Sequence, residues 1–349
     1  MSIVWSRVYS ASGFRDGVFS VCVSNGRVYA VGFDEVPGPG LMRYRVESYR
    51  ASSGERAGAW SDEKGYPYAT LSSCSVLGDK LYVAGATSGF WSILEFNKDL
   101  KLVRRADFNE PCFNPFSMIA LDNYLYLAGV LIENGYGKSI YVAKIDLSDL
   151  IMVKSREIKL NNSSTGAYVI EYDVKTNQLV LGGFTESNGE PEWLILYLSR
   201  ELEPLKYLRP GFRNAITGLA VDYDGYIYAV DGARVVKLTV DGKVLAVSDN
   251  TPGVKIYAEK SKVSPLRQYV IVASNDSIYI LASRDLKTIA SLKLPSEKPL
   301  QANTGRINSE SNHVYLALTQ IASRNNWNWA VYALGIKPRG LFARIFRKH

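Results

Sequence analysis

A repeating unit of about 48 residues constrains this 349-residue chain more than any other feature of its sequence. Each unit contains an apolar strand, a tight polar turn and a second strand that ends in a small residue. The second strands carry seven marker residues, spaced 41 to 53 residues apart: Tyr29, Tyr82, Tyr126, Leu179, Tyr228, Tyr269 and Tyr315. Repeats of this length are typical of β-propeller blades rather than of shorter solenoid units.

The pattern within one unit predicts four strands. In the second unit, apolar stretches at 73–77, 81–84, 91–96 and 100–105 are separated by turns or loops. Turns such as Gly78-Asp79 use residues that tolerate a positive φ in tight hairpins. Hydrophobic residues make up 47% of the chain, which is enough for a core, and helical periodicity is almost absent before the last dozen residues. We therefore predict an all-β protein, a single β-propeller of seven four-stranded blades.

The two ends of the chain complete the predicted ring. The last unit supplies only three strands, the third at 329–334, and residues 4–9 form a strand without a partner ahead of the first unit. If this strand is the outer strand of the last blade, the ring closes and leaves only short, protected edges. The sequence thus predicts a propeller over residues 1–336 and a separate tail over residues 337–349.

The units resemble known propeller repeats. Residues 222–231, followed by 234–238 and 241–245, look like an NHL-type blade. The second to fourth units, with the pattern Leu-Tyr-x-Ala-Gly and a later stretch such as 139–146, resemble SBBP-type and kelch-like repeats. These are turn and core residues, so the resemblance implies a propeller and assigns no site. Such repeats occur in binding proteins, lactonases, sugar hydrolases and quinoprotein dehydrogenases alike.

Histidine and cysteine offer little material for catalysis or metal binding. His313 lies in a predicted turn and His349 is the last residue, so a histidine-based triad or metal site is not expected. The three cysteines, Cys22, Cys74 and Cys112, include no C-x-x-C pair. We expect them to be buried free thiols rather than a disulfide framework or a zinc site. We expect no cofactor and no bound metal.

Clustered carboxylates support a rival hypothesis. The clusters are Asp222, Asp224 and Asp231 in one unit and Glu186, Glu190 and Glu192 in one long loop. In this blade pattern we expect the aspartates to be turn and cap residues and the glutamates to form a solvated loop. The alternative is a metal-dependent lactonase or a glycan-acting hydrolase that uses carboxylates in the central channel. The sequence favours a non-enzymatic protein.

The starts of the inner strands carry the most informative polar residues. Gly13-Phe14-Arg15-Asp16 before the first blade is echoed by Gly211-Phe212-Arg213-Asn214 before the fifth. Counting back about fourteen residues from the markers gives the positions expected at one mouth of the channel: Arg15, Tyr68, Cys112, Thr165, Asn214 and Lys255. Arg213 is adjacent to Asn214 in the chain, and Arg306 is expected slightly deeper in the channel. Such a mouth would bind an anion, because guanidinium groups match carboxylate and phosphate. Alternatively, these cations pair with Asp16, the only acidic residue expected beside them, or with carbonyl groups.

Aromatic side chains should lie on the same face, in the loops between second and third strands. Three tryptophans are either exposed there or buried at strand starts: Trp91, Trp193 and Trp329. A fourth, Trp327, is flanked by asparagines. Exposed aromatic residues suit protein hot spots or sugar stacking. The candidate ligand-binding residues are therefore Arg15, Tyr68, Arg213, Asn214, Lys255, Arg306 and Trp327. The predicted function is a scaffold that binds a partner protein or an anionic ligand through this face.

Charge and hydropathy bear on partners and on localisation. The net charge is +7, but we find no contiguous Lys/Arg stripe, so nucleic-acid binding is not expected. In the tail, Leu341, Phe342, Ile345 and Phe346 would share one face of a short helix. The tail could lie on an acidic membrane surface, dock on a partner or fold back on the propeller. Without a secretory-signal pattern or an apolar run of about 18–20 residues, we expect a cytoplasmic protein.

Overall fold

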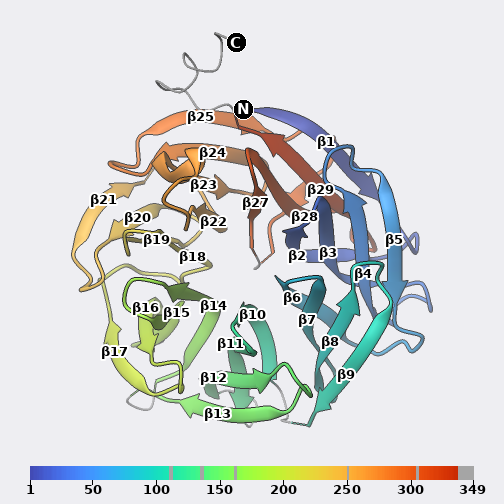
Figure 1. Ribbon diagram of the computed structural model, residues 1–349, viewed down its shortest axis with the longest axis horizontal. Helices are drawn as coiled ribbons and strands as arrows, with labels where there is room; N and C mark the ends of the chain where they lie inside the picture. The colour runs from blue at the N-terminus through green and yellow to red at the C-terminus, as the bar shows by residue number, and fades with distance from the viewer. Residues whose placement is uncertain (110–112, 134–136, 161–162, 250, 304–305, 337–349) are drawn as a thin grey trace.

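Seven antiparallel sheets stand around a central axis in the computed structural model of this protein (Figure 1). The structure describes residues 1–109, 113–133, 137–160, 163–249, 251–303 and 306–336. Six sheets have four strands each, and the seventh has the same arrangement with its inner strand split in two. The all-β, seven-bladed propeller predicted from the repeat period is confirmed. The predicted tail, 337–349, lies outside the described residues.

The first four blades run from the inner to the outer strand in chain order. Blade 1 contains β2 (Gly17–Ser24), β3 (Arg27–Asp34), β4 (Arg43–Arg50) and β5 (Arg56–Ser61). Blade 2 contains β6 (Ala69–Leu77), β7 (Lys80–Thr87), β8 (Trp91–Asn97) and β9 (Leu102–Phe108). Blade 3 contains β10 (Phe113–Leu121), β11 (Tyr124–Glu133), β12 (Gly137–Asp146) and β13 (Met152–Ile158). Blade 4 contains β14 (Thr165–Asp173), β15 (Gln178–Ser187), β16 (Glu190–Leu198) and β17 (Pro204–Leu208).

The last three blades are less regular. Blade 5 contains β18 (Gly218–Val221), β19 (Ile227–Val230), β20 (Val235–Leu238) and β21 (Val244–Ser248). Blade 6 contains β22 (Lys255–Ala258), β23 (Tyr269–Ala273), β24 (Ser277–Ala282) and β25 (Thr288–Lys293), with the 3-10 helix η1 (Pro265–Gln268) before β23. Blade 7 contains β26 (Leu300–Gln301), β27 (Asn308–Glu310), β28 (His313–Ser323), β29 (Asn326–Gly335) and β1 (Ser2–Tyr9).

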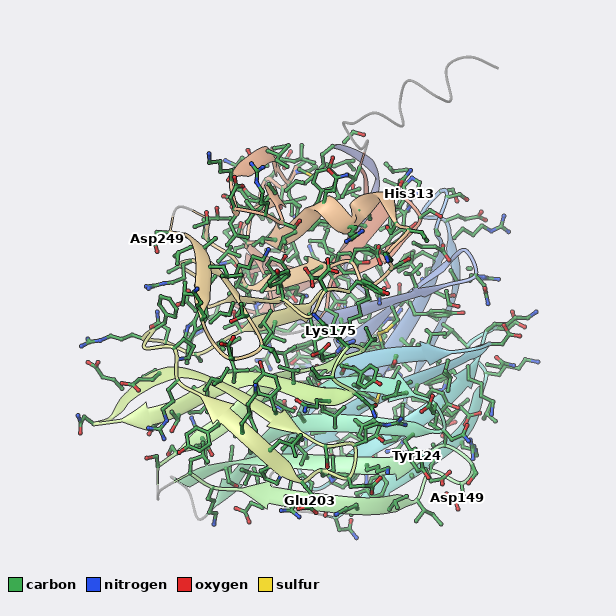
Figure 2. All side chains as sticks on the ribbon, turned by 60° about the vertical axis from the view of Figure 1, so that its left-hand side comes forward. Tyr124, Asp149, Lys175, Glu203, Asp249 and His313 are labelled. Carbon is green, nitrogen blue, oxygen red and sulfur yellow. A yellow bond between two sulfur atoms is a disulfide. The ribbon has the colours of Figure 1, made fainter. Side chains whose placement is uncertain are left out.

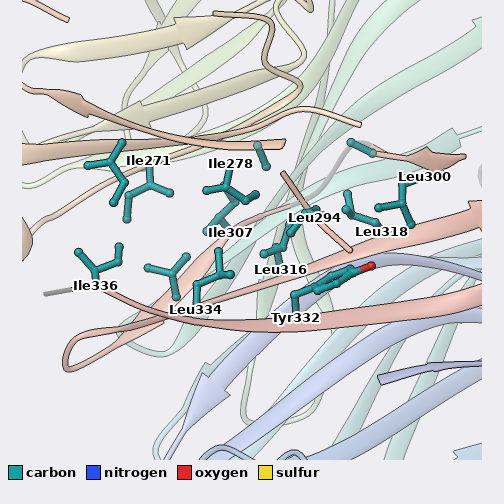
Figure 3. Packing of buried hydrophobic residues seen from close by; sticks show 14 of the residues in the cluster. Ile271, Ile278, Leu294, Leu300, Ile307, Leu316, Leu318, Tyr332, Leu334 and Ile336 are labelled. Carbon is teal, nitrogen blue, oxygen red and sulfur yellow. The ribbon is translucent and has the colours of Figure 1, made fainter. Parts of the chain in front are cut away.

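Burial explains why the sequence pattern changes from strand to strand. Second and third strands such as β7 and β8 are buried over nearly their whole length, because neighbouring blades cover both sides of each sheet. They therefore read as continuous apolar runs. Outer strands such as β13 alternate between exposed and partly buried residues, which is the period-two pattern of a strand with one solvated side. Figure 3 shows the apolar packing in the cluster that joins blades 6 and 7.

The ring is closed by β1, as predicted. β1 pairs with β29 in antiparallel register from Ser2↔Gly335 to Tyr9↔Trp329. Trp5 of β1 is 6% exposed, and its indole N–H donates a hydrogen bond of 2.8 Å to the carbonyl oxygen of Ala51 in blade 1. Its ring lies 6.1 Å from that of Tyr49 in blade 1 and 6.2 Å from that of Tyr315 in blade 7. Trp5 therefore joins the last blade to the first.

The inner strands of the first four blades share a β-bulge near their starts. The register shifts between Val18 and Ser20 in β2, and comparable shifts occur in β6, β10 and β14. At the bulge, an inner-strand carbonyl group approaches the second strand so closely that a side chain is excluded there. A Cβ atom built on Gly32 would lie 1.9 Å from the carbonyl oxygen of Gly17, and Gly85 and Gly183 are equally crowded by backbone atoms. The bulge therefore requires the small residue in these three second strands, which the structure places two to four residues before the strand end rather than at the end itself.

One prediction about the cysteines is wrong. Cys22 of β2 and Cys74 of β6 form a disulfide, with their Cα atoms 6.1 Å apart. They are 52 residues apart, about one blade repeat, so the two inner strands place them side by side in adjacent blades. Both side chains are buried, as expected. Cys112 lies outside the described residues.

The structure has two faces, defined by the direction of the inner strands. At the channel-mouth face the inner strands begin, and this face carries the links between blades and the loops between second and third strands. The opposite face carries the turns between first and second strands and between third and fourth strands. Among the described residues, no helix is long and apolar enough to cross a membrane.

Candidate functional site

The two echoed segments occupy equivalent places at the channel-mouth face. Each begins with a glycine at positive φ, 77° at Gly13 and 82° at Gly211, and then runs beside the third strand of the preceding blade. The N–H of Asp16 donates to the carbonyl oxygen of Trp327 at 3.1 Å, and the N–H of Asn214 donates to that of Pro191 at 2.8 Å. The sequence echo is therefore a structural repeat that ties each link to the blade before it.

Arg15 lies at this face in a network of protein contacts. Its guanidinium Nη2 is 2.6 Å from Oε1 of Glu35, and its Nε donates to the same oxygen at 2.9 Å. The guanidinium carbon also lies 5.6 Å from the centre of the Trp327 ring. Glu35 is buried, so this pair, in which two guanidinium N–H groups donate to one carboxylate oxygen, is better shielded from water than a surface ion pair. The structure therefore brings Arg15 and Trp327 together and neutralises Arg15.

Asp16 supports the link rather than a ligand. It is fully buried, and its carboxylate accepts hydrogen bonds from the backbone N–H groups of Ala11 and Ser12 and from the hydroxyl groups of Ser10 and Ser12. All four of these donors belong to the link itself. Asp16 is thus not the acidic partner of Arg15.

Arg213, Asn214 and Tyr68 also lie at the channel-mouth face, on other links. Arg213 is 79% exposed at its side chain and pairs with Glu190 at 3.0 Å. Asn214 is exposed and has a φ of 79°. Tyr68 is partly exposed on the link between blades 1 and 2, and its hydroxyl accepts a hydrogen bond of 3.1 Å from the amide of Asn114. No contact between described residues joins these three to Arg15.

Lys255 has an inward position that the sequence predicted, with an unexpected environment. It is fully buried at the start of β22, and its amine donates hydrogen bonds of 2.8 Å to the carbonyl oxygens of Phe19 and Ala317. Phe19 is the bulged residue of β2, whose carbonyl the regular ladder leaves free. Among the ion pairs of the described residues, none includes Lys255. Burial lowers the pKa of its amine from 10.5 to about 7.

The buried Lys255 amine should make stability depend on pH. Above about pH 7 the folded protein holds a neutral amine, whereas the unfolded chain keeps the proton up to about pH 10.5. Unfolding therefore takes up a proton in this window, and stability rises with pH. Relative to Lys255→Met, the unfolding free energy of the wild type should increase by up to about 1.4 kcal/mol per pH unit between pH 7 and 10. Urea unfolding at four pH values measures this, and the exposed Lys64→Met should keep the wild-type slope. Parallel curves for wild type and Lys255→Met would contradict it.

Arg306 lies deeper, as expected, where it contacts β14 of blade 4. Its Nη2 is 2.9 Å from Oε1 of Glu171 in blade 4, and the amine of Lys260 in blade 6 contacts the other oxygen of that buried carboxylate. The nearby cations hold the pKa of Glu171 below its usual value, although burial alone would raise it. This group of three side chains connects blades 4, 6 and 7 across the axis. It also shows that the cations have more acidic neighbours than Asp16, namely Glu35, Glu190 and Glu171.

The carboxylates behind the enzyme hypothesis have local roles. Asp222 accepts hydrogen bonds from the N–H groups of Asp224 and Tyr226 and from the hydroxyl of Tyr228, within its own turn and strand. Asp231 accepts from the N–H of Ala233 and from the indole of Trp193. Within the residues that the structure describes, no group of three or more His, Cys, Asp and Glu side chains is placed to hold a metal ion.

A feature that the sequence reasoning missed lies beside Arg15. The loop between β3 and β4 exposes Val36, Pro37, Pro39 and Leu41, and the following link exposes Pro67 and Tyr68. We call these six residues the rim patch. The pattern Val-Pro-Gly-Pro-Gly-Leu, apolar yet rich in turn residues, was the signal that could have revealed it. Three other tryptophans do not contribute to this surface, since each is fully buried in the third strand of its blade: Trp91, Trp193 and Trp329.

The rim patch rests on a rigid support. Buried Asp34 accepts from the N–H of Val36 at 3.1 Å, and buried Glu35 accepts from the N–H of Gly40 at 3.3 Å. Met42 and Tyr66 exchange two backbone hydrogen bonds of 2.7 Å, which fasten the loop to the next link. The loop therefore holds its apolar side chains in water in one defined conformation.

Comparisons with known proteins show the fold and no family. No protein-family model matches the chain, and no curated protein matches it at the sequence level. The WD40 domain of Pan2 from Neurospora crassa matches with a TM-score of 0.61 and 8% identity, covering 92% of this chain and 90% of that chain. A chain of a mitotic checkpoint complex matches with a TM-score of 0.63 and 13% identity, covering 95% of both chains. BamB from Moraxella catarrhalis matches with a TM-score of 0.52 and 13% identity, covering 96% of this chain and 99% of that chain.

These similarities confirm the β-propeller. At such low identity they carry the fold alone, because unrelated functions share propeller scaffolds. The neighbours are WD40 and BamB propellers, so the finer resemblance to NHL-type, SBBP-type and kelch-like repeats stays a prediction.

Proposed function

We propose that this propeller is a non-enzymatic scaffold that binds a partner protein through its channel-mouth face. The observation that carries the proposal is the rim patch, an exposed apolar loop held in one conformation by buried carboxylates. Ordering a loop on binding costs free energy, so a loop that is already ordered binds more tightly. Partly exposed Tyr68 adds the type of side chain that dominates many protein interfaces.

A protein partner is favoured over a free anion. Arg15 and Arg306 already donate to protein carboxylates, so an incoming anion would have to displace Glu35 or Glu171. Arg213 is the most exposed cation of the candidate set and could form a charged contact at the rim of an interface. An apolar patch with charges at its margin is the usual composition of a protein-binding surface.

The double substitution Val36→Asp and Leu41→Asp tests the proposal. Burying a carboxylate in an apolar contact is costly, so capture of partner proteins from an extract of the source cells should fall at least about tenfold. The matched control is Ile151→Asp with Val153→Asp, which adds the same charges to more exposed apolar residues beside and on β13. The control should retain the proteins that the wild type retains. Equal capture by all three proteins, each with an unchanged melting temperature, would contradict the proposal.

A further inference from the structure

Three consecutive turns on the opposite face form one continuous surface. The amine of Lys175, in the β14–β15 turn, donates to the carbonyl oxygen of Asp224 in the β18–β19 turn at 3.2 Å. The carboxylate of Asp224 pairs with Arg267 of blade 6 at 3.1 Å, and the N–H of Tyr223 donates to the carbonyl oxygen of Glu259 at 3.3 Å. The turns of blades 4, 5 and 6 therefore contact one another in sequence.

An apolar side chain is exposed on each of these turns. Val174 is 47% exposed, Tyr223 38% and Val263 92%. Single exposed apolar residues are ordinary in soluble proteins. Here, however, three exposed apolar residues lie on adjoining turns of one face, and each is next to a cation. This arrangement needs a physical explanation. We call Val174, Lys175, Tyr223, Lys262, Val263 and Arg267 the turn patch.

The position of Val263 is built into the fold. It lies in the connection from Glu259 to Gln268, whereas the corresponding turns of blades 1 and 2 have two residues. The hydroxyl of Ser264 accepts from the N–H of Leu266 at the start of η1, and Leu266 is fully buried. Glu259 accepts from the N–H of Ser261 at 2.9 Å. The long connection is thus anchored on both sides of an exposed valine.

Basic side chains lie around the exposed apolar residues of these three turns. The amine of Lys262 lies 5.9 Å from the centre of the Tyr223 ring, and Lys175 and Arg267 flank the same turn. Of these three, Arg267 pairs with Asp224, whereas no ion pair among the residues that the structure describes includes Lys175 or Lys262. Figure 2 labels Lys175, and also His313, which begins β28 directly after the corresponding turn of blade 7 and so does not lie in the turn where the sequence placed it.

The chain segment that follows Ile336 is also both basic and apolar in sequence. The N–H of Ile336 donates to the carbonyl oxygen of Asn312, in the turn before β28. The next thirteen residues, 337–349, contain five Lys or Arg residues, no Asp or Glu, and the apolar residues Leu341, Phe342, Ile345 and Phe346. The rest of the chain has 36 basic and 34 acidic residues. Most of the excess positive charge is therefore in the segment directly after a residue of the opposite face.

We infer that the opposite face docks on an anionic membrane surface through the turn patch. A bilayer interface is anionic at the lipid phosphates and apolar just below them, which matches lysines beside exposed valine and tyrosine tips. Tips carried by neighbouring turns of one propeller face also suit a flat surface. In this orientation the rim patch points away from the membrane and stays free for a protein partner.

Vesicle co-sedimentation tests the inference. The full chain should pellet with vesicles of phosphatidylcholine and phosphatidylserine and stay in solution with phosphatidylcholine alone. Each basic residue near an anionic bilayer is worth roughly fivefold in affinity, so Lys175→Glu with Lys262→Glu should reduce binding at least about tenfold. Val263→Asp should also weaken binding. The matched control, Lys64→Glu with Arg209→Glu, makes the same charge change away from the turn patch and should bind as the wild type does.

Three results would overturn the inference. The first is equal binding to neutral and anionic vesicles, or no binding to either. The second is wild-type binding by the Lys175→Glu, Lys262→Glu variant while truncation after residue 336 abolishes binding, since the tail alone would then be responsible. The third is binding to nucleic acid or to an acidic protein without binding to vesicles. The Val36→Asp, Leu41→Asp variant should keep its vesicle binding, which separates this test from that of the proposed function.

Discussion

Removing residues 1–10 is expected to open the ring and to prevent stable folding. The deletion removes the outer strand of blade 7 and exposes the edge of β29 along the register from Ser2↔Gly335 to Tyr9↔Trp329. It also removes Trp5, which fills the contact between blades 7 and 1. Loss of a buried tryptophan alone costs about 3–5 kcal/mol, and a typical domain has only about 5–15 kcal/mol of stability. The truncated protein should therefore melt at much lower temperature or fail to fold cooperatively.

Two further variants separate ring closure from a general effect of truncation. Trp5→Ala keeps the strand and should cost about 3–5 kcal/mol in chemical denaturation. Val4→Ala with Val8→Ala alters exposed side chains of the same strand and should have little effect, since surface substitutions usually stay within about 0.5 kcal/mol. A synthetic peptide of residues 1–10 should partly restore the melting temperature of the truncated chain. An unchanged melting temperature after truncation would show that β1 does not close the ring.

Breaking the Cys22–Cys74 disulfide should have the second largest effect. The bond closes a loop with a sequence separation of 52 residues and joins the inner strands of blades 1 and 2. In the chain-entropy account, closing a loop of that length restricts the unfolded chain by about 4 kcal/mol. Guanidinium denaturation of Cys22→Ala with Cys74→Ala should show that the free energy of unfolding falls by about that amount. The smaller alanine side chains at these two buried positions should lower it further.

Reducing agent provides the control for the disulfide. Dithiothreitol should lower the denaturation midpoint of the wild type and leave that of the double variant unchanged. A thiol titration of the unfolded, unreduced wild type should find one thiol per chain out of the three cysteines. Three thiols in protein taken from its native source would contradict the bond. The same titration bears on the predicted cytoplasmic localisation, because disulfides persist chiefly in oxidising compartments.

The sequence was sufficient for the architecture because the propeller is a local repeat. Blades 1 to 6 are meanders of consecutive strands, and blade 7 departs from this only in its outer strand, β1. The spacing of Tyr29, Tyr82 and the other markers therefore reports the number of blades directly. The last unit lacks a fourth strand and the early strand around Trp5 lacks a partner, so pairing the two was the way to leave no unpaired edge. The echo of Gly13–Asp16 in Gly211–Asn214 likewise corresponds to two equivalent links.

The sequence was a poor guide to what surrounds each candidate side chain. Counting residues from a marker placed Arg15 correctly at the channel-mouth face, but it could not show that buried Glu35, 20 positions later, would neutralise it. Arg306 and Glu171 are 135 positions apart and meet only because blades 4 and 7 face each other across the axis. Cys22 and Cys74 could have been paired in advance from their spacing, which nearly equals the distance between the first two markers.

The sequence by itself determined the number of blades, the closure of the ring and the face on which the links lie, since these follow from periods and turns that each unit carries. Only the tertiary structure decided which charges are free. Whether Lys255 is neutral, whether Arg15 is paired and whether Val263 is exposed all depend on groups that the closed ring brings from distant blades. Hydrogen bonds, ion pairs and packing contacts act over a few ångströms in space, and a circular fold makes residues far apart in the chain neighbours at that distance.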